Sequence, residues 1–463
     1  METSLTRKLY DRSPVFLQHL YATAYGLQKR LRRYGRAFRE YRRFFEGSAR
    51  WSRSEFEAFQ DEKVREVVRN AYENVPFHRQ RMDALHLTPG DVRGVADLPK
   101  LPLLEKSEVR EAGDAMFSTA IPRRRILSAV TSGSTGFPMK AAWTSEALQR
   151  EYAFLWARRR PGVRRGDSYG SFTGLQLVPA GRLTPPFWRY NWASSQTCYS
   201  MFHLTPETIP LYLDEMARRR HVYLEGYPSV VALLGKHLLD RRIDWPCPPR
   251  AMFTEAEQLQ DEHRRWIEQG FKTRVYNQYG QCEKASSITE YDCGHLHYEM
   301  DYSVIEFLPV DREEGGTVAE IVCTAFDNPA YPLIRYRIGD LALVPDAPPA
   351  CPRMASPVVT AIFGRTGQSL ISRDGRRINN ISVIVKRCQR IEMVQCLQYE
   401  PGVVEVRVVR SPGYTAADEA TLLDQFGQKM GEMAFRLVYV AGPEGFERTR
   451  RGKFLSIVSK LPR

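Results

Sequence analysis

A stretch rich in glycine and hydroxyl side chains has the composition of an anion-binding loop. It begins at Thr131 and reaches a cation at Lys140. Its glycines let the backbone bend tightly, so its N–H groups can approach the oxygens of a phosphate. The residues assigned to this predicted phosphate-binding loop are Thr131, Ser132, Gly133, Ser134, Thr135, Gly136 and Lys140. The Walker A spacing cannot be fitted here, and an ordinary polar turn is the alternative.

A second candidate is a Tyr-Gly turn that is followed by a carboxylate. Tyr279 and Gly280 come just after a predicted strand, and Glu283 follows them closely. An aromatic ring at such a turn can stack on a purine, and a carboxylate is a suitable oxygen ligand for Mg²⁺. The pattern predicts a nucleotide site, to which Gln281 and Cys282 also belong. The alternative is a buried strand end with a surface glutamate.

Asp340 and Lys453 are the next candidates. Asp340 closes a run of nine residues, Pro-Leu-Ile-Arg-Tyr-Arg-Ile-Gly-Asp. A carboxylate in this position can accept hydrogen bonds from two neighbouring hydroxyls, as a ribose diol requires. Lys453 follows a glycine near the end of the sequence, where it can offset negative charge between a carboxylate and a phosphate. No G-x-S-x-G elbow is present, which argues against serine hydrolysis.

The remaining candidate is a metal site. Cys293, His295 and His297 lie within five residues, and Cys351 follows later in the sequence. Thiolate and imidazole ligands of this kind can form a tetrahedral zinc site. The alternative, that they are ordinary polar residues, stays open. The eight cysteines are too scattered for a disulfide framework.

Alternating strands and helices must position these residues. Residues 1–125 are expected to be mainly helical. Further helices are predicted over 145–160, 210–220, 229–241 and 261–269, with strands over 251–254 and 273–276. This alternation predicts a parallel sheet covered on both faces, and the segment 301–345 has β-rich patterning. The fold class is therefore α/β, and 463 residues suggest two or three domains.

Charge and hydropathy limit the classes of binding partner that the sequence predicts. The net charge of +13 raises the question of nucleic acid, but no nucleic-acid-binding motif accompanies it, so none is expected. The densest basic segment, 29–43, carries Tyr34, Phe38, Tyr41 and Phe45 at helical spacing. We expect this stripe to pack on the protein, with membrane-surface contact as the alternative. Neither a transmembrane run nor a signal peptide is visible, which predicts a cytoplasmic protein.

Taken together, the motifs resemble those of the adenylate-forming (ANL) superfamily. They occur in its order: T-S-G-S-T-G-x-P-x-K, then Thr254-Glu255-Ala256-Glu257, then the Tyr-Gly turn, then the run ending at Asp340, then Gly364-Arg365, and last R-T-x-x-G-K ending at Lys453. The N-terminal region and the stretch around Tyr227 loosely resemble the phenylacetate–CoA ligase branch of this superfamily and its capsular-polysaccharide relatives.

This resemblance implies roles for the motif residues. Ala256, Glu257 and Tyr279 would edge the adenine, with Glu283 on magnesium and Cys282 in place of the hydroxyl that contacts the α-phosphate. Asp340 would hold the ribose, and Arg365 the ribose or a phosphate. Thr135, Glu283 and Lys453 would be the catalytic set. The resemblance also implies a large N-terminal domain over 1–364, with layered parallel sheets, helices and a β-rich subdomain. A small, mobile α+β domain would follow over 365–463.

The implied reaction is ATP- and Mg²⁺-dependent activation of a carboxylic acid through an acyl-adenylate, with coenzyme A as the expected acceptor. Tyr169, Phe172, Tyr227 and Tyr276 make an aromatic or otherwise flat acid plausible. Transfer to an amine or a sugar is the runner-up, and an inactive relative that binds an anionic polymer is the third reading. In this branch the cysteine–histidine cluster is a structural zinc site. The identity of the acid and the oligomeric state are not predicted.

Overall fold

The computed structural model describes residues 9–130, 140–175, 177–179, 182–351, 354–365, 370–371, 373, 377–378, 390–430, 433–448 and 454–461. The predicted phosphate-binding loop from Thr131 to Gly136 lies outside these residues, and so does Lys453. The backbones of Lys140 and Arg365 are described, but their side chains are not.

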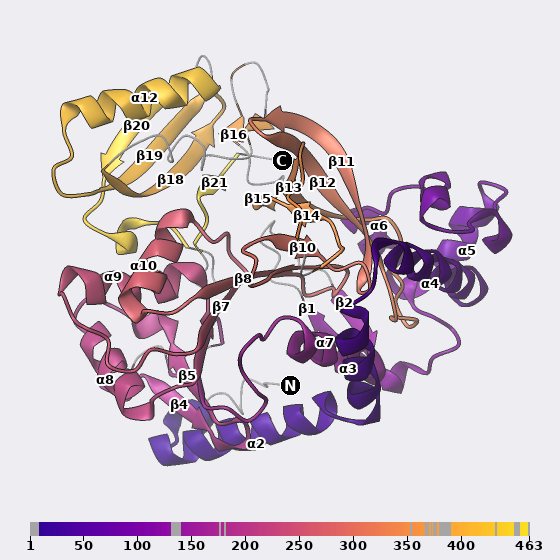
Figure 1. The fold of residues 1–463 in the computed structure, drawn as a ribbon, viewed down its shortest axis with the longest axis horizontal. Helices are drawn as coiled ribbons and strands as arrows, with labels where there is room; N and C mark the ends of the chain where they lie inside the picture. The colour runs from indigo at the N-terminus through magenta and orange to yellow at the C-terminus, as the bar shows by residue number, and fades with distance from the viewer. Residues whose placement is uncertain are drawn as a thin grey trace.

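Helices dominate the N-terminal part of the chain, as the sequence predicts. They are α2 Val15–Arg33, α3 Arg36–Ser48, α4 Arg53–Asn74, α5 Pro76–Asp83 and α6 Lys106–Ala112 (Figure 1). α4 begins with a capping box, in which the side chains of Ser52 and Glu55 bond to each other's backbone N–H groups. No helix among the described residues is both long enough and apolar enough to cross a bilayer.

The basic segment 29–43 is two helices, which corrects the prediction of a single one. The chain breaks at Gly35, whose backbone is extended. The side-chain oxygen of Gln149 accepts hydrogen bonds from the N–H groups of Gly35 and Phe38, at 3.1 and 3.2 Å, and so satisfies the start of α3. Phe38 and Phe45 are buried, so the aromatic stripe packs on the protein as expected.

A nine-stranded sheet forms the centre of the molecule, in the order β14-β10-β9-β8-β7-β6-β3-β5-β4. Neighbouring strands from β5 through β3, β6 and β7 to β8 run parallel, and the pairs at both edges are antiparallel. The strands are β3 Tyr169–Thr173, β4 Trp188–Asn191, β5 Gln196–Ser200, β6 Tyr223–Gly226, β7 Ala251–Glu255, β8 Val275–Gly280, β9 Ser287–Glu290, β10 Leu296–Tyr298 and β14 Val358–Val359.

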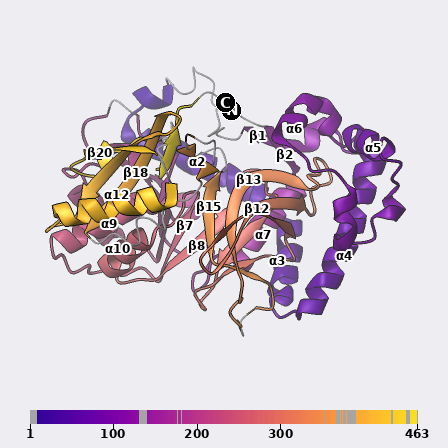
Figure 2. The ribbon, with the colours of Figure 1, turned by 90° about the horizontal axis from the view of Figure 1, so that it is seen from above.

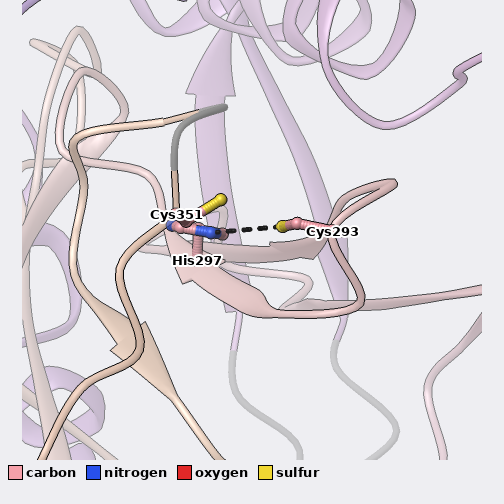
Figure 3. A group of neighbouring side chains, drawn as sticks. All are labelled: Cys293, His297 and Cys351. Carbon is pink, nitrogen blue, oxygen red and sulfur yellow. Dashed lines mark hydrogen bonds between the residues drawn. The ribbon is translucent and has the colours of Figure 1, made fainter.

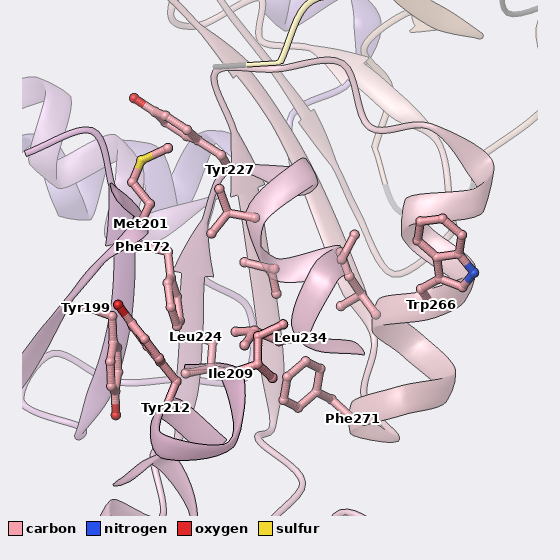
Figure 4. Close-up of a cluster of buried hydrophobic side chains, with 14 of the residues drawn as sticks. Phe172, Tyr199, Met201, Ile209, Tyr212, Leu224, Tyr227, Leu234, Trp266 and Phe271 are labelled. Carbon is pink, nitrogen blue, oxygen red and sulfur yellow. The ribbon is translucent and has the colours of Figure 1, made fainter. Parts of the chain in front are cut away.

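Helices cover both faces of this sheet, which confirms the α/β prediction. One face packs against α8 Ile209–Arg219, α9 Pro228–Asp240 and α10 Asp261–Phe271. Figure 4 shows that core, with Phe172 and Leu224 of the sheet facing Leu234 of α9 and Phe271 of α10. On the opposite face, Trp156 of α7 (Ser145–Ala157) packs against a cluster of sheet residues that includes Phe253.

The segment 301–345 is β-rich, as predicted, and belongs to a four-stranded antiparallel sheet. Its strands are β11 Ser303–Glu313, β12 Gly316–Ala325, β13 Tyr336–Pro345 and β15 Ala361–Arg365. Two short hairpins complete this part: β1 Ile126–Val130 with β2 Lys140–Thr144, and β16 Leu370–Ile371 with β17 Arg377–Ile378. Val130 pairs with Lys140, so the predicted phosphate-binding loop connects the two strands of a hairpin.

The C-terminal part has its own sheet, in the order β20-β19-β18-β21, and its own core. Its elements are β18 Ile391–Glu400, β19 Val403–Arg410, α12 Ala416–Met430, β20 Ala434–Tyr439 and β21 Ile457–Ser459. Seen from above, these elements lie beside α9 and α10 (Figure 2), and Met393 and Val409 join the core of those helices. A domain boundary between residues 364 and 365 stays a prediction.

Candidate functional site

β7 and β8 bring two of the sequence motifs to one edge of the central sheet. The strands are adjacent and parallel, with Glu255 opposite Gln278, so their carboxyl ends meet. Ala256 follows β7 with a φ of 71°, in the left-handed region that favours glycine. Strained backbone of this kind gathers at ligand-binding turns. The turn of Ala256 and Glu257, here called the predicted adenine-binding turn, therefore lies next to the Tyr-Gly turn.

Tyr279 of β8 and Asp340 of β13 are hydrogen-bonded, although they come from different sheets. The Tyr279 hydroxyl donates to Asp340 Oδ2 at 2.7 Å. Burial, together with the Asp340 carboxylate, raises the pKa of Tyr279 well above its ordinary value, so the hydroxyl remains a donor. The backbone of Arg365 pairs with that of Asp340 across β13 and β15. Two motifs that lie 61 residues apart in the sequence thus meet at one point.

Glu283 lies behind the Tyr-Gly turn and is almost completely buried. The Tyr336 hydroxyl donates to Glu283 Oε1 at 3.2 Å and orients the carboxylate. The sequence did not predict this contact, although Tyr336 is the middle residue of the run that ends at Asp340. Its neighbour Arg335 has a structural role, an ion pair with Glu306 at 2.7 Å. This one motif therefore contains three kinds of residue. Asp340 is a candidate for nucleotide binding, Tyr336 orients the candidate magnesium ligand Glu283, and Arg335 stabilises the fold.

The two residues between the Tyr-Gly turn and Glu283 differ in their surroundings. Gln281 folds its side chain back: its Nε2 donates to Ser286 Oγ at 2.5 Å, and its Oε1 accepts from the Ser286 N–H at 3.0 Å. Its predicted contribution to nucleotide binding is therefore limited to the backbone. Cys282 is exposed, where a bound ligand could reach it.

Glu257 joins three parts of the chain. Its Oε2 accepts from the N–H of Ser229 at the start of α9, at 3.1 Å. Its Oε1 accepts from the N–H of Phe454, at 2.6 Å, and Arg448 donates to Ser229 Oγ at 3.1 Å. Burial raises the pKa of Glu257, and these hydrogen bonds oppose that shift. The C-terminal segment on both sides of Lys453 is thereby fixed to the predicted adenine-binding turn.

A cavity of about 240 Å³ lies between α2, α7 and the face of the central sheet opposite α9. Tyr169 lines it and stacks on Tyr223, with ring centroids 4.7 Å apart. Glu255 lines it too, immediately before the predicted adenine-binding turn. The cavity therefore reaches the edge of the sheet where the two motifs meet. Of the four predicted acid-binding residues, Tyr169 is the one that lines this cavity.

The other three predicted acid-binding residues lie elsewhere. Phe172 alternates with Tyr169 along β3, so its side chain points to the opposite face of the sheet. It is fully buried between aromatic rings, which leaves no surface for a bound acid. Tyr227 is buried in the same core (Figure 4). Tyr276 is also buried, and its hydroxyl donates to Asp292 at 2.8 Å.

Three consecutive arginines follow α7, and all three are buried. Arg158 forms ion pairs with Glu299 and Asp301. Arg160 forms an ion pair with Glu225 and a hydrogen bond with Gln278.

Arg159 differs from its two neighbours. Its nearest carboxylates, on Glu151 and Glu255, are 3.9 and 3.8 Å away, beyond hydrogen-bonding distance. Among the described residues, its Nε has no hydrogen-bond partner. Its guanidinium lies against the Tyr-Gly turn, since a Cβ placed on Gly280 would be 3.3 Å from Nη1.

Cys293, His297 and Cys351 form the predicted metal cluster, with ligand atoms within 4.8 Å of one another (Figure 3). The Ser356 carbonyl is 2.8 Å from His297 Nδ1. A carbonyl can only accept, so Nδ1 carries the proton and the lone pair of Nε2 points toward Cys293 Sγ, 3.6 Å away. His295 is not part of this group, which corrects its prediction as a fourth ligand. Its ring centroid lies 6.5 Å from that of His297.

Several curated proteins and many solved structures are similar to the chain, whereas no family model matches it. Protein CapK of Staphylococcus aureus is 27% identical over 377 residues, which are 81% of each chain. A phenylacetate-coenzyme A ligase of Thermus thermophilus is 26% identical over 356 residues, 69% of this chain and 73% of that protein. The crystal structure of 2-hydroxyisobutyryl-CoA ligase in the postadenylation state gives a TM-score of 0.66 at 16% identity, and covers 88% of this chain and 90% of that one. This likeness shows a shared fold.

Proposed function

We propose that the chain is an ATP-dependent carboxylate-activating ligase of the adenylate-forming superfamily, in its phenylacetate–CoA ligase branch. In the proposed first step, a carboxylate oxygen attacks the α-phosphorus of ATP and displaces pyrophosphate, which gives an acyl-adenylate. In the second step, the thiol of coenzyme A attacks the acyl carbon, and AMP and a proton leave. We place the reaction in the cytoplasm, where both cosubstrates are available.

The observation that carries this proposal is the hydrogen bond between Tyr279 and Asp340. The sequence assigns one residue to the adenine and the other to the ribose, on independent motifs. Their contact at 2.7 Å supports a single site that spans a nucleoside. Glu283, oriented by Tyr336, offers the carboxylate that would hold Mg²⁺, and the metal would neutralise charge on the phosphates.

Binding and electrostatics carry the proposed chemistry, since the reaction needs no protein nucleophile. Asp340 fixes the ribose and so orients the α-phosphate for attack. The contact between Glu257 and Phe454 keeps the C-terminal segment beside the nucleotide site, within one residue of Lys453. If the C-terminal part rotates between the two steps, so that a different face binds the acceptor, the hydrogen bond between Glu257 and Phe454 must break.

The proposed activity can be tested with the purified full chain, ATP and Mg²⁺. Pyrophosphate release is measured across a panel of aromatic and aliphatic acids, and thioester formation is then measured with coenzyme A. We expect one or more acids to stimulate pyrophosphate release. Calorimetry with ATP alone tests the nucleotide site independently of the acid. Absence of ATP binding would contradict the proposal.

We further propose that the acid lies in the cavity beside Tyr169 and that Arg159 binds one of its oxygen atoms. A buried guanidinium without hydrogen bonds is costly, because it has lost its hydration without gaining partners. The Arg159 Nε has no hydrogen-bond partner among the described residues, and the nearest carboxylates are 3.8 and 3.9 Å from the guanidinium, which lies against Gly280 of the nucleotide turn. An acid that reaches from the cavity to this turn would supply the missing acceptor.

Substitution of Arg159 by leucine is expected to raise the KM for the acid roughly 10- to 100-fold, because a hydrogen bond to a charged group contributes about 1.5–3 kcal/mol. The KM for ATP should stay unchanged. Arg159→Lys is the matched control, since it keeps the charge and should recover part of the affinity. Equal loss for acid and ATP would indicate that Arg159 only supports the fold.

We also propose that Cys293, His297 and Cys351 hold one zinc ion. The donor set fits, because two thiolates and an oriented imidazole are typical zinc ligands and leave one position of a tetrahedron open. The ion would tie β10 to the segment before β14, and its role would be structural.

Elemental analysis of the purified chain should therefore find about one zinc per molecule, and a chelator should lower its melting temperature. Cys293→Ser should lose the metal. Cys247→Ser, which changes a free cysteine outside the cluster, should keep it. Metal-free protein of unchanged stability would refute this site.

A further inference from the structure

Helix α2 turns its large apolar side chains away from the protein. Phe16, Leu20, Leu27 and Leu31 recur at helical spacing along one side. Their exposed fractions are 63, 41, 49 and 74%. The residues that α2 buries are Gln18, His19, Ala22 and Gly26, which are polar or small. An ordinary surface helix does the reverse and buries its apolar stripe.

Polar contacts fix this orientation of α2. Arg189 donates to Gln18 Oε1 at 2.6 Å, in the buried interface between the helix and β4. The N–H of Tyr190 donates to His19 Nδ1 at 3.1 Å. Rotation of the helix to bury its apolar stripe would break both contacts and leave a buried arginine with fewer acceptors. The exposed stripe is therefore a built feature of the fold.

The charge of this region is of one sign. Between Val15 and Arg39 the chain has six lysines and arginines and no acidic residue. Arg30 and Arg32, in the last turn of α2, are exposed and place cations near the end of the apolar stripe, whereas Arg33 turns inward and lies over the Tyr152 ring. Trp192, half exposed, lies beside the helix, and its backbone N–H donates to Thr23 Oγ1 at 3.2 Å. Tryptophan is common where proteins meet the boundary between lipid and water.

We propose that α2 docks the protein on the surface of an anionic lipid bilayer. The helix lies in the plane of the interface, its stripe of Phe16, Leu20, Leu27 and Leu31 enters the acyl boundary, and its cations bind lipid headgroups. A second copy of the chain is the weaker fit. It would offer an apolar stripe, but its own α2 has no acidic residue to pair with the cations.

The test is flotation of the purified full chain with phosphatidylcholine vesicles that contain or lack phosphatidylglycerol. We expect binding to the anionic vesicles that weakens as salt is raised. Leu20→Glu combined with Leu31→Glu should lower this binding more than about tenfold, because the apolar burial of two leucines is lost. The matched control combines Leu85→Glu with Val310→Glu, which removes two exposed apolar side chains elsewhere and makes the same change in charge. The control should bind like the unaltered chain.

Three outcomes would overturn the proposal. The unaltered chain does not float with anionic vesicles, or both double variants lose binding equally, which would indicate attraction by net charge alone. In the third, the chain is a dimer by light scattering, does not bind vesicles, and becomes monomeric in the Leu20→Glu, Leu31→Glu variant. That result would assign the stripe to a second copy. Unchanged melting temperatures of both variants would confirm that they fold.

Discussion

Asp340→Asn is expected to weaken ATP binding by roughly 10- to 100-fold, because a hydrogen bond to a charged acceptor contributes about 1.5–3 kcal/mol. The substitution removes the charge but keeps an oxygen that can accept the hydrogen bond of Tyr279, so the fold should be retained. Calorimetric titration with ATP measures the change directly. It needs neither the acid nor the acceptor.

Tyr279→Phe is the matched control for this prediction. It removes the inter-sheet hydrogen bond that Asp340→Asn can keep, yet it retains the Asp340 carboxylate and an aromatic ring at the proposed adenine site. We expect a smaller loss of ATP affinity than for Asp340→Asn. Equal losses would mean that Asp340 acts by positioning Tyr279. Unchanged affinity in Asp340→Asn would mean that the ribose lies elsewhere.

The parallel sheet and the meeting of the motifs could be predicted from the sequence, because both depend on local patterns. Strands that alternate with helices of suitable length leave few arrangements, and parallel strands bring their carboxyl ends to one edge. Glu255 and Gln278 are paired there as that rule requires. The nine-residue run at Asp340 predicted that this residue belongs with the Tyr-Gly turn, and the two motifs are in contact through the hydrogen bond of Tyr279 to Asp340.

The residues of the proposed acid site were harder to predict, because they depend on which face of the sheet each side chain occupies. Tyr169 and Phe172 were both assigned to the acid. They are three positions apart in one strand, so they point to opposite faces, and Tyr169 alone reaches the cavity. The sequence did not indicate a binding role for Arg159, because a run of three arginines usually indicates exposed, solvated charges. Its burial and its missing acceptor follow from tertiary packing.

The exposed stripe of α2 was missed for a related reason. In the sequence, the more conspicuous stripe is formed by the aromatic residues of 29–43, which the fold buries through Phe38 and Phe45. The pattern of α2 itself resembles that of a packed helix. It becomes distinctive only when the opposite side, with Gln18 and His19, is found facing β4. Periodicity identifies a helix and its apolar face, but not what that face contacts.

Lys453→Ala is expected to slow pyrophosphate formation by roughly 100- to 1,000-fold, which is the typical effect of removing a preorganised donor from a site where charge develops. The lysine is proposed to matter while the carboxylate attacks ATP, because its charge offsets the negative charge between the two. The next residue, Phe454, is bonded to Glu257 of the predicted adenine-binding turn, which supports placement of this segment at the site.

The two half-reactions separate this role from a structural one. Lys453→Ala should still convert an acyl-adenylate that is supplied from outside, because the proposed second step uses a different face of the C-terminal domain. Lys460→Ala is the matched control: it removes a lysine of the same segment that forms an ion pair with Glu447, and should leave both half-reactions unchanged. An ordinary surface lysine at 453 would give the same result as this control. Equal loss of both half-reactions would instead show that the C-terminal domain does not exchange faces between the two steps, even if the chain is a ligase.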